Sequence, residues 1–143
     1  MKKALSLLFL LPFCYSLLAA DEKPYTSLVI DAQQLELERS ESPKILSEKG
    51  YEVYGTIFDN LDKALEAGVF FYAPTLDEAK KYDAKRIGLN PLFIKAKSSS
   101  GVVKTDLVVS DLDALKILKE NKKSHFLDQF KVIVLVSKPT ASE

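Results

Sequence analysis

The sequence is poor in the residues that most often carry chemistry. It contains one cysteine, Cys14, one histidine, His125, and no tryptophan. Because Cys14 lies in the N-terminal apolar segment, the rest of the chain offers no thiolate nucleophile, no cysteine metal ligand and no disulfide. A single histidine cannot build a multi-histidine zinc site. We therefore expect a protein that is not an enzyme, with no catalytic residues, no metal ligands and no cofactor.

The sequence also lacks an excess of charge of one sign. Twenty Lys and Arg side chains balance twenty Asp and Glu side chains. Binding to nucleic acid needs a clustered positive field, so this balance excludes nucleic acid as the expected partner. After residue 20 no apolar run is long enough to cross a bilayer. We expect membrane contact only through the N-terminus, if the chain is anchored at all.

The first twenty residues have the layout of a secretory signal peptide. Lys2 and Lys3 precede an almost wholly apolar stretch over residues 4–18, and Ala19 and Ala20 precede a charged residue. The apolar stretch is shorter than a membrane-spanning helix and contains a proline. This pattern predicts export and cleavage after Ala20. The expected location is the periplasm, the outer-membrane periphery or the outside of the cell.

Cys14 raises the alternative of a lipoprotein that is acylated at this residue. Phe13 stands where lipoprotein processing prefers a small residue, and Pro12 precedes it. Lipidation of Cys14 is therefore the weaker reading, and a plain apolar cysteine within the leader is the stronger one.

Residues 21–24 are expected to form a polar tether, residues 25–137 a single domain, and residues 138–143 a polar tail. Apolar periodicity predicts strands at 28–30, 44–46, 51–57, 92–96, 102–109 and 132–136. Capping residues predict helices at 59–67 and 75–82 and a third that begins after Ser110. The expected fold class is α+β, a mixed, mainly antiparallel sheet with two or three helices packed on it.

Several details of this fold are specific enough to be tested. Gly50 should turn a hairpin, and residues 97–101 should join two strands as a serine-glycine turn. The order strand, helix, strand over residues 102–136 predicts a parallel pair. In the third helix Leu112, Leu115 and Leu118 should point into the core.

Three consecutive aromatic residues, Phe70, Phe71 and Tyr72, are the candidate interface. Successive side chains of a strand point to opposite faces, so at least one of the three can meet a partner. Packing of all three against a helix is the simpler alternative. His125 is expected to be a helix-terminal residue, and Glu36, Glu38 and Glu41 a solvated acidic stretch.

Seven short segments of the sequence together resemble a module of exported bacterial cell-envelope proteins. They are residues 28–32, 42–46, 50–55, 90–92, 104–110, 126–127 and 132–136. This module is found in proteins related to the twenty-kilodalton lipoprotein family, some of them associated with the flagellum. The resemblance covers most of residues 25–136 and rests on structural motifs. The family usually has Arg-Gly and a further glycine after the Asp-Ala pair, where this sequence has Gln33, Gln34 and Glu36.

From the predicted signal peptide and the resemblance we expect a non-enzymatic exported cell-envelope protein that acts through protein–protein contacts. It would scaffold an outer-membrane or flagellar assembly, with envelope proteins of unknown identity as partners. The alternative is a soluble periplasmic domain that binds a small ligand or a cell-wall fragment, which needs a pocket with converging polar groups. A cavity reached by Asp31 or Asp106 would favour this alternative.

Overall fold

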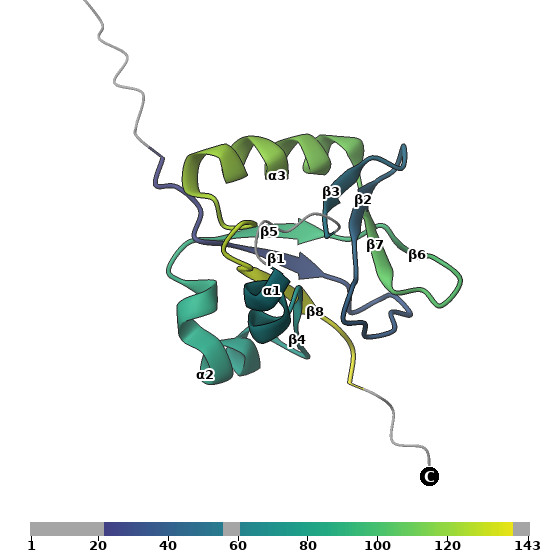
Figure 1. Cartoon of the computed structure of the whole chain (residues 1–143), viewed down its shortest axis with the longest axis horizontal. Helices are drawn as coiled ribbons and strands as arrows, with labels where there is room; N and C mark the ends of the chain where they lie inside the picture. Colours follow the sequence, from purple (N-terminus) through teal and green to yellow (C-terminus); the bar gives the residue numbers. More distant parts are fainter. Residues whose placement is uncertain (1–21, 56–60, 139–143) are drawn as a thin grey trace, which may run out of the picture.

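The structure is a computed structural model that describes residues 22–55 and 61–138 of the 143-residue chain. Its described part contains three helices and eight strands arranged in two four-stranded sheets (Figure 1). Residues 1–20 with Cys14, the proposed cap Asp59 and the tail after residue 138 lie outside the described residues.

The first sheet consists of strands that are parallel throughout. Its order is β4–β8–β1–β5, with β1 at Ser27–Asp31, β4 at Phe71–Ala73, β5 at Pro91–Lys95 and β8 at Val132–Leu135. The central strand β8 is buried along its whole length. A continuous apolar run covered on both faces is typical of a parallel sheet, and this confirms the interpretation of residues 132–136 as a central strand.

The second sheet is mixed and has the order β3–β2–β7–β6. Its strands are β2 at Ile45–Ser47, β3 at Glu52–Tyr54, β6 at Ser98–Ser100 and β7 at Asp106–Val109. Strands β2 and β3 form the predicted antiparallel hairpin, and Gly50 in its turn has a φ of +84°. Strands β6 and β7 form a second antiparallel pair, whereas β2 and β7 are parallel.

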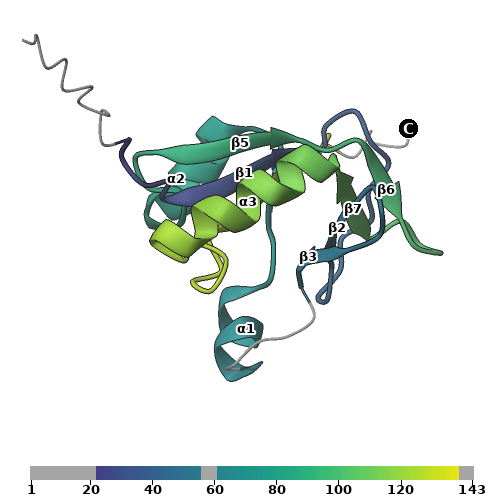
Figure 2. The same ribbon diagram turned by 90° about the horizontal axis from the view of Figure 1, so that it is seen from above.

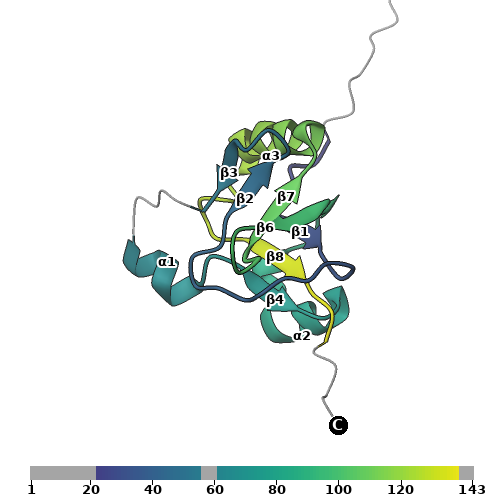
Figure 3. The ribbon, with the colours of Figure 1, turned by 90° about the vertical axis from the view of Figure 1, so that its right-hand side faces the viewer.

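The helices cover the parallel sheet from two sides. They are α1 at Leu61–Ala67, α2 at Leu76–Ile87 and α3 at Asp111–Ser124. Figure 3 shows α2 and α3 on opposite sides of β1. Ala79 and Ile87 of α2 pack against one apolar cluster of the parallel sheet, whereas Ala114 and Ile117 of α3 belong to the larger cluster that this sheet shares with the mixed sheet.

The α+β fold class and the helices packed on a sheet are confirmed, but the strands are arranged differently from the expectation. Two sheets replace the single, mainly antiparallel one, because the antiparallel hairpins form only where strands are adjacent in sequence. The expected parallel pair across residues 102–136 does not form, since β7 pairs with β2 and β6, and β8 pairs with β1 and β4.

Two local predictions were wrong. Residues 98–100 form strand β6 and the turn lies at residues 101–104, where Gly101 and Lys104 both have positive φ. The predicted inward face of α3 is its outward face. Leu112, Leu115 and Leu118 are 79%, 65% and 40% exposed, whereas Ala114 and Ile117 are buried. Alanine lets the helix approach the sheets closely, so the leucines are left on the far side.

Two predicted helix caps are present. The Ser110 hydroxyl accepts a hydrogen bond from the Asp113 amide at 3.0 Å, and the Thr75 hydroxyl accepts one from the Glu78 amide at 3.1 Å. Asp83 interrupts α2 with non-helical dihedral angles, close to the predicted end at Tyr82, and a further turn then reaches Ile87. This last turn brings Arg86 to the site described below.

Candidate functional site

The three candidate aromatic residues follow α1 and run into the edge strand β4, where they divide between core and surface. Phe70 is buried and stacks on Tyr54, with ring centroids 6.2 Å apart. Phe71 and Tyr72 are half-buried and point to opposite faces, as neighbouring residues of a strand must. Phe71 packs beside the α2 cluster and Tyr72 beside the larger core. Phe70 is therefore a residue of the core and not of an exposed interface.

Phe71 lies under a cation that the sequence did not single out. The guanidinium carbon of Arg86 sits 5.2 Å from the centre of the Phe71 ring. Arg86 Nε also lies 3.5 Å from Asp83 Oδ2, and its Nη2 donates to the carbonyl oxygen of Ala67. Ala67 is the last residue of α1, so this hydrogen bond satisfies a carbonyl that the helix leaves without an internal partner.

Around Phe71 the surface forms a groove of about 770 Å³ between α1, α2 and the segment before β8, which we name the Phe71 groove. Its lining includes Lys63, Glu66, Phe71, Asp83, Arg86 and Asp128. Charged side chains of both signs line it together with Phe71, and the Arg86 side chain is only 11% exposed. A lining that mixes an aromatic ring with charged groups suits a protein surface as partner, because such interfaces combine apolar and polar contacts.

Tyr72 faces the opposite side of β4 and contacts Arg39, which lines a second groove. Its hydroxyl accepts a hydrogen bond from the Ser40 amide at 3.3 Å, and the Arg39 guanidinium lies 5.6 Å from its ring centre. A groove of about 580 Å³ lies beside this contact and is lined by residues 35–39, Lys104 and residues 136–138. We name it the carboxyl-edge groove, because it lies where β1 and β8 end.

Gln33 and Gln34 close this edge of the parallel sheet. The Gln33 side-chain amide donates to the Pro74 carbonyl at 2.5 Å, and that of Gln34 donates to the Ala96 carbonyl at 3.0 Å. Pro74 follows β4 and Ala96 follows β5, so the two glutamines tie together the two outer strands of the sheet. The turn that they occupy is closed by the backbone, because the Leu35 amide donates to the Ala32 carbonyl at 3.0 Å.

The carboxylates of Asp31 and Asp106, which the sequence suggested as parts of a ligand site, accept hydrogen bonds from backbone amides instead. Asp31 Oδ1 accepts from the Gln33 amide at 3.0 Å, and Asp106 Oδ1 accepts from the Lys44 amide at 2.9 Å. Neither residue lines the two grooves. His125 caps the C-terminal end of α3 in the left-handed conformation, and its Nδ1 lies 3.1 Å from Asp128 Oδ2. The helix-terminal interpretation of His125 is confirmed.

The pKa values of two tyrosines and one glutamate are shifted by burial and by neighbouring charges. Burial raises the pKa of Tyr54 and of Tyr72 above the usual tyrosine value, although the nearby Arg39 and the Ser40 amide reduce the effect at Tyr72. The Lys104 ammonium group lowers the pKa of the exposed Glu36 carboxyl by a hydrogen bond and by charge. Both tyrosine hydroxyls are therefore neutral at physiological pH. Within residues 22–55 and 61–138 no three His, Cys, Asp or Glu side chains gather as a metal site.

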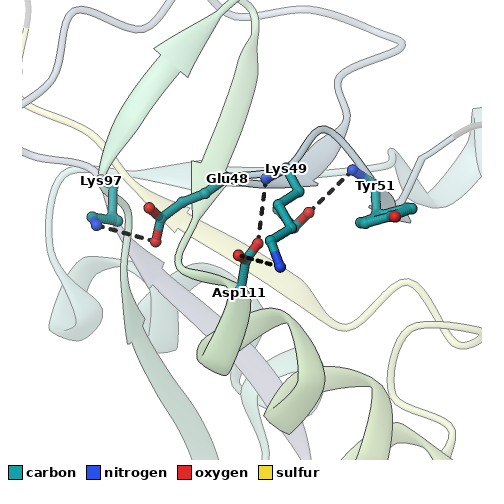
Figure 4. Close-up of polar contacts among 6 residues, drawn as sticks. Glu48, Lys49, Tyr51, Lys97 and Asp111 are labelled. Atoms are coloured by element: carbon teal, nitrogen blue, oxygen red, sulfur yellow. Dashed lines mark hydrogen bonds and ion pairs between the residues drawn. The ribbon is translucent and has the colours of Figure 1, made fainter.

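The turn between β2 and β3 is held from two sides (Figure 4). Glu48 Oε1 lies 3.1 Å from Lys97 Nζ, in the segment after β5. The Lys49 amide donates to Asp111 Oδ1 at 3.3 Å, and Lys49 Nζ lies 3.8 Å from Asp111 Oδ2. Because Asp111 is the first residue of α3, these contacts fix the start of this helix against the mixed sheet.

The structure is an α+β domain in which a parallel and a mixed sheet share one core. The comparisons give the family. Residues 27–138 match the family described as the second domain of Treponema pallidum Tp0624, and the chain belongs to this family. No curated protein matches the chain. In the described part of the chain no helix has the length and apolar character needed to cross a bilayer.

Proposed function

We propose that this chain is an exported protein of the bacterial cell envelope that acts by binding other proteins and has no catalytic activity of its own. The observation that carries the proposal is the Phe71 groove. There a half-buried aromatic ring lies beside a nearly buried arginine, and charges of both signs surround them. Aromatic and arginine side chains are the residue types that contribute most to protein–protein binding.

The pairing of the polar groups supports contact rather than catalysis. Arg86 is engaged by Asp83, by the end of α1 and by the Phe71 ring. His125 is paired with Asp128 on the surface. A general base acts on a substrate proton within hydrogen-bond reach, and a nucleophile needs such a base beside it. These groups bind each other instead.

The cellular location and the scaffolding role are part of the same proposal. The layout of residues 1–20 supports export, and the resemblance to the twenty-kilodalton lipoprotein family supports a role in scaffolding an outer-membrane or flagellar assembly. Membership of the Treponema pallidum Tp0624 second-domain family is compatible with a bacterial envelope protein. The partners would then be envelope proteins that meet the Phe71 groove.

A second function is favoured by the position of the carboxyl-edge groove. In open sheets of parallel strands, ligands commonly bind beyond the carboxyl ends of the strands, and the groove there is lined by Arg39, Lys104 and Lys138 together with Glu36 and Glu38. A small ligand or a cell-wall fragment that carries groups of both charges would suit this lining. If soluble cell-wall fragments raise the melting temperature and Lys104→Gln removes this shift, ligand binding replaces protein binding as the proposed function.

Loss of the Phe71 ring should weaken the native complex. We expect Phe71→Ala to lower the affinity for the envelope partner at least fivefold, because truncation of a central interface residue costs more than about 1 kcal/mol. The measurement is the size distribution of the protein in mildly solubilised cell envelopes. Phe93→Ala, which removes an exposed ring of β5 outside the groove, is the matched control.

Because Phe71 is half-buried, a second variant separates binding from folding. Lys131→Glu changes the charge of a groove residue that is not part of the core clusters. Both groove variants should unfold cooperatively and should shift the protein from the large complex to the size of the free chain. A complex of unchanged size in both variants would contradict the assignment of this surface.

Export is tested by the intact mass of the protein from fractionated cells. We expect a mass that begins at Asp21, in the periplasmic or external fraction, because signal peptidases cleave after small residues such as Ala20. A mass that begins at Cys14 with added acyl chains, in the membrane fraction, would make the chain a lipoprotein. An uncleaved chain in the cytosol would contradict export itself.

A further inference from the structure

The outward face of α3 is an unusual surface for a helix that packs on a sheet. Its side toward the core presents Ala114 and Ile117, and its far side presents Leu112, Leu115 and Leu118. Figure 1 shows α3 along the top of the molecule, with the sheets and the other helices beneath it. These three leucines are therefore exposed to solvent on the outward side of α3.

Lysines share this outward face. Lys116, Lys119 and Lys122 are all exposed, and Lys119 lies four residues after Leu115 and seven after Leu112, on the same stripe of the helix. Of the acidic residues of α3, Asp111 is bound by Lys49 and Glu120 by Lys123, and Asp113 in the first turn is only partly exposed. We name the set Leu112, Leu115, Lys116, Leu118, Lys119 and Lys122 the α3 surface; it is apolar and positively charged.

A surface of the opposite charge lies on α1. Leu61 and Leu65 are 64% and 68% exposed, and Asp62, Lys63 and Glu66 are exposed beside them, so two carboxylates stand against one lysine. In the described helix only Ala64 is buried. Figure 2 shows α1 standing away from the rest of the fold. We name Leu61, Asp62, Leu65 and Glu66 the α1 surface; it pairs exposed leucines with carboxylates.

We propose that the α1 surface of one copy of this chain docks on the α3 surface of a second copy. Leucines would be buried against leucines, and Asp62 and Glu66 would meet Lys116, Lys119 and Lys122. In all three views α1 and α3 lie apart, so the two surfaces of one chain do not meet each other. The contact is therefore heterologous, with each chain carrying one donor and one acceptor surface.

The arrangement of the α3 surface favours a protein over a lipid bilayer. A helix that lies in a membrane interface separates a continuous apolar face from its basic face. On α3 leucines and lysines share one side of the helix, because Lys119, one turn beyond Leu115, falls between Leu112 and Leu115 when the helix is viewed along its axis. A bilayer would also leave the exposed leucines of α1 uncovered, whereas a second copy covers both surfaces at once.

The lengths of the two helices limit the area of the contact and therefore its affinity. At about 1.5 Å per residue α3 is about 21 Å long and α1 about 10 Å long, so the contact is smaller than a standard stable interface. Association is expected to be weak, to require high protein concentration, and to weaken with salt because exposed charges are screened. Such contacts become effective where copies are concentrated, as in the envelope assembly.

Sedimentation velocity of the purified chain tests the proposal. We expect the weight-average mass to rise above that of one chain as the concentration approaches about 1 mM. The α3 variant Leu115→Glu/Lys119→Glu and the α1 variant Asp62→Asn/Leu65→Gln, whose new α1 side chains carry no charge, should each remain monomeric over the same range. An equal mixture of the two variants retains one intact surface from each. The mixture should therefore form dimers and nothing larger.

Controls separate this result from the proposed function and from loss of folding. Leu89→Lys changes a fully exposed leucine outside both surfaces and should associate like the parent chain. Phe71→Ala should also associate normally, because Phe71 belongs to neither surface; of the α1 surface only Glu66 also lines the Phe71 groove. The α1, α3 and Leu89 variants should give the parent circular dichroism spectrum, since each of their changed side chains is exposed.

Three results would overturn the inference. The parent chain could remain monomeric at every concentration. The α1 variant could associate as strongly as the parent, which would remove α1 as the donor. Finally, all chains could be monomeric while the α3 variant alone fails to sediment with phosphatidylglycerol vesicles, which would make the α3 surface a lipid contact.

Discussion

Ile117→Ala is expected to lower the free energy of unfolding by about 2–5 kcal/mol, the range found for truncating a fully buried isoleucine. Ile117 is inaccessible to solvent and belongs to the cluster that α3 shares with both sheets. Its loss removes buried apolar surface and leaves a cavity that the sheet cannot close by local movement. Urea denaturation of the variant and the parent chain measures the difference.

Leu115→Ala is the matched control on the same helix. Leu115 is 65% exposed, so the same kind of truncation should change the free energy of unfolding by less than about 0.5 kcal/mol. The apolar pattern alone predicted the reverse order, with Leu115 inward. Equal losses for the two variants, or a larger loss for Leu115→Ala, would mean that α3 is rotated from the position described here.

Gly55→Ala is expected to lower the free energy of unfolding by about 2–5 kcal/mol, because it combines an unfavourable backbone conformation with a steric clash. Gly55 has a φ of +124°, and a Cβ atom there would lie 2.9 Å from the Cα of Lys44 and still closer to the Pro43 carbonyl oxygen. Both obstacles are backbone atoms, which cannot rotate away. The segment before β2 would have to move.

Gly50→Ala isolates the backbone contribution in this comparison. Gly50 has a φ of +84°, and a Cβ atom there would meet nothing within 4 Å. We expect a loss of about 1 kcal/mol, the cost of a left-handed conformation alone. Thermal unfolding of both variants checks the difference. If Gly55→Ala is as mild as Gly50→Ala, the approach of residues 43–44 is looser than the structure indicates.

Local structure could be predicted from the sequence where a few neighbouring residues decide it. The turn at Gly50 and the cap at Ser110 depend on the positive φ of a glycine and on one hydroxyl beside free amides. The orientation of α3 could not be predicted this way, because alanine and leucine both appear in its apolar periodicity. Leucine is more apolar, yet the smaller Ala114 allows the closer approach to the sheets.

Strand pairing and the candidate site depend on distant residues, and the sequence predicted them only in part. Apolar β-branched runs mark β1 and β8 as buried strands but do not specify their neighbours. Phe71 was found because three adjacent aromatic residues cannot all point inward. Arg86 was missed because its approach to Phe71 depends on the interruption of α2 at Asp83, which the sequence pattern does not show.

The pairing of β1 with β8 has a consequence for the time at which the domain can fold. Leu28 is aligned with Leu92 of β5 on one side and with Val132 of β8 on the other, so the second neighbour of the first strand lies 104 positions later in the chain. Such long-range pairing makes folding slow, because a large loop must close before its contacts form. In a nascent chain the parallel sheet therefore stays incomplete until β8 has been synthesised, because β8 joins β4 to β1. A polypeptide with this delay is well suited to being threaded through a narrow pore before it acquires its shape.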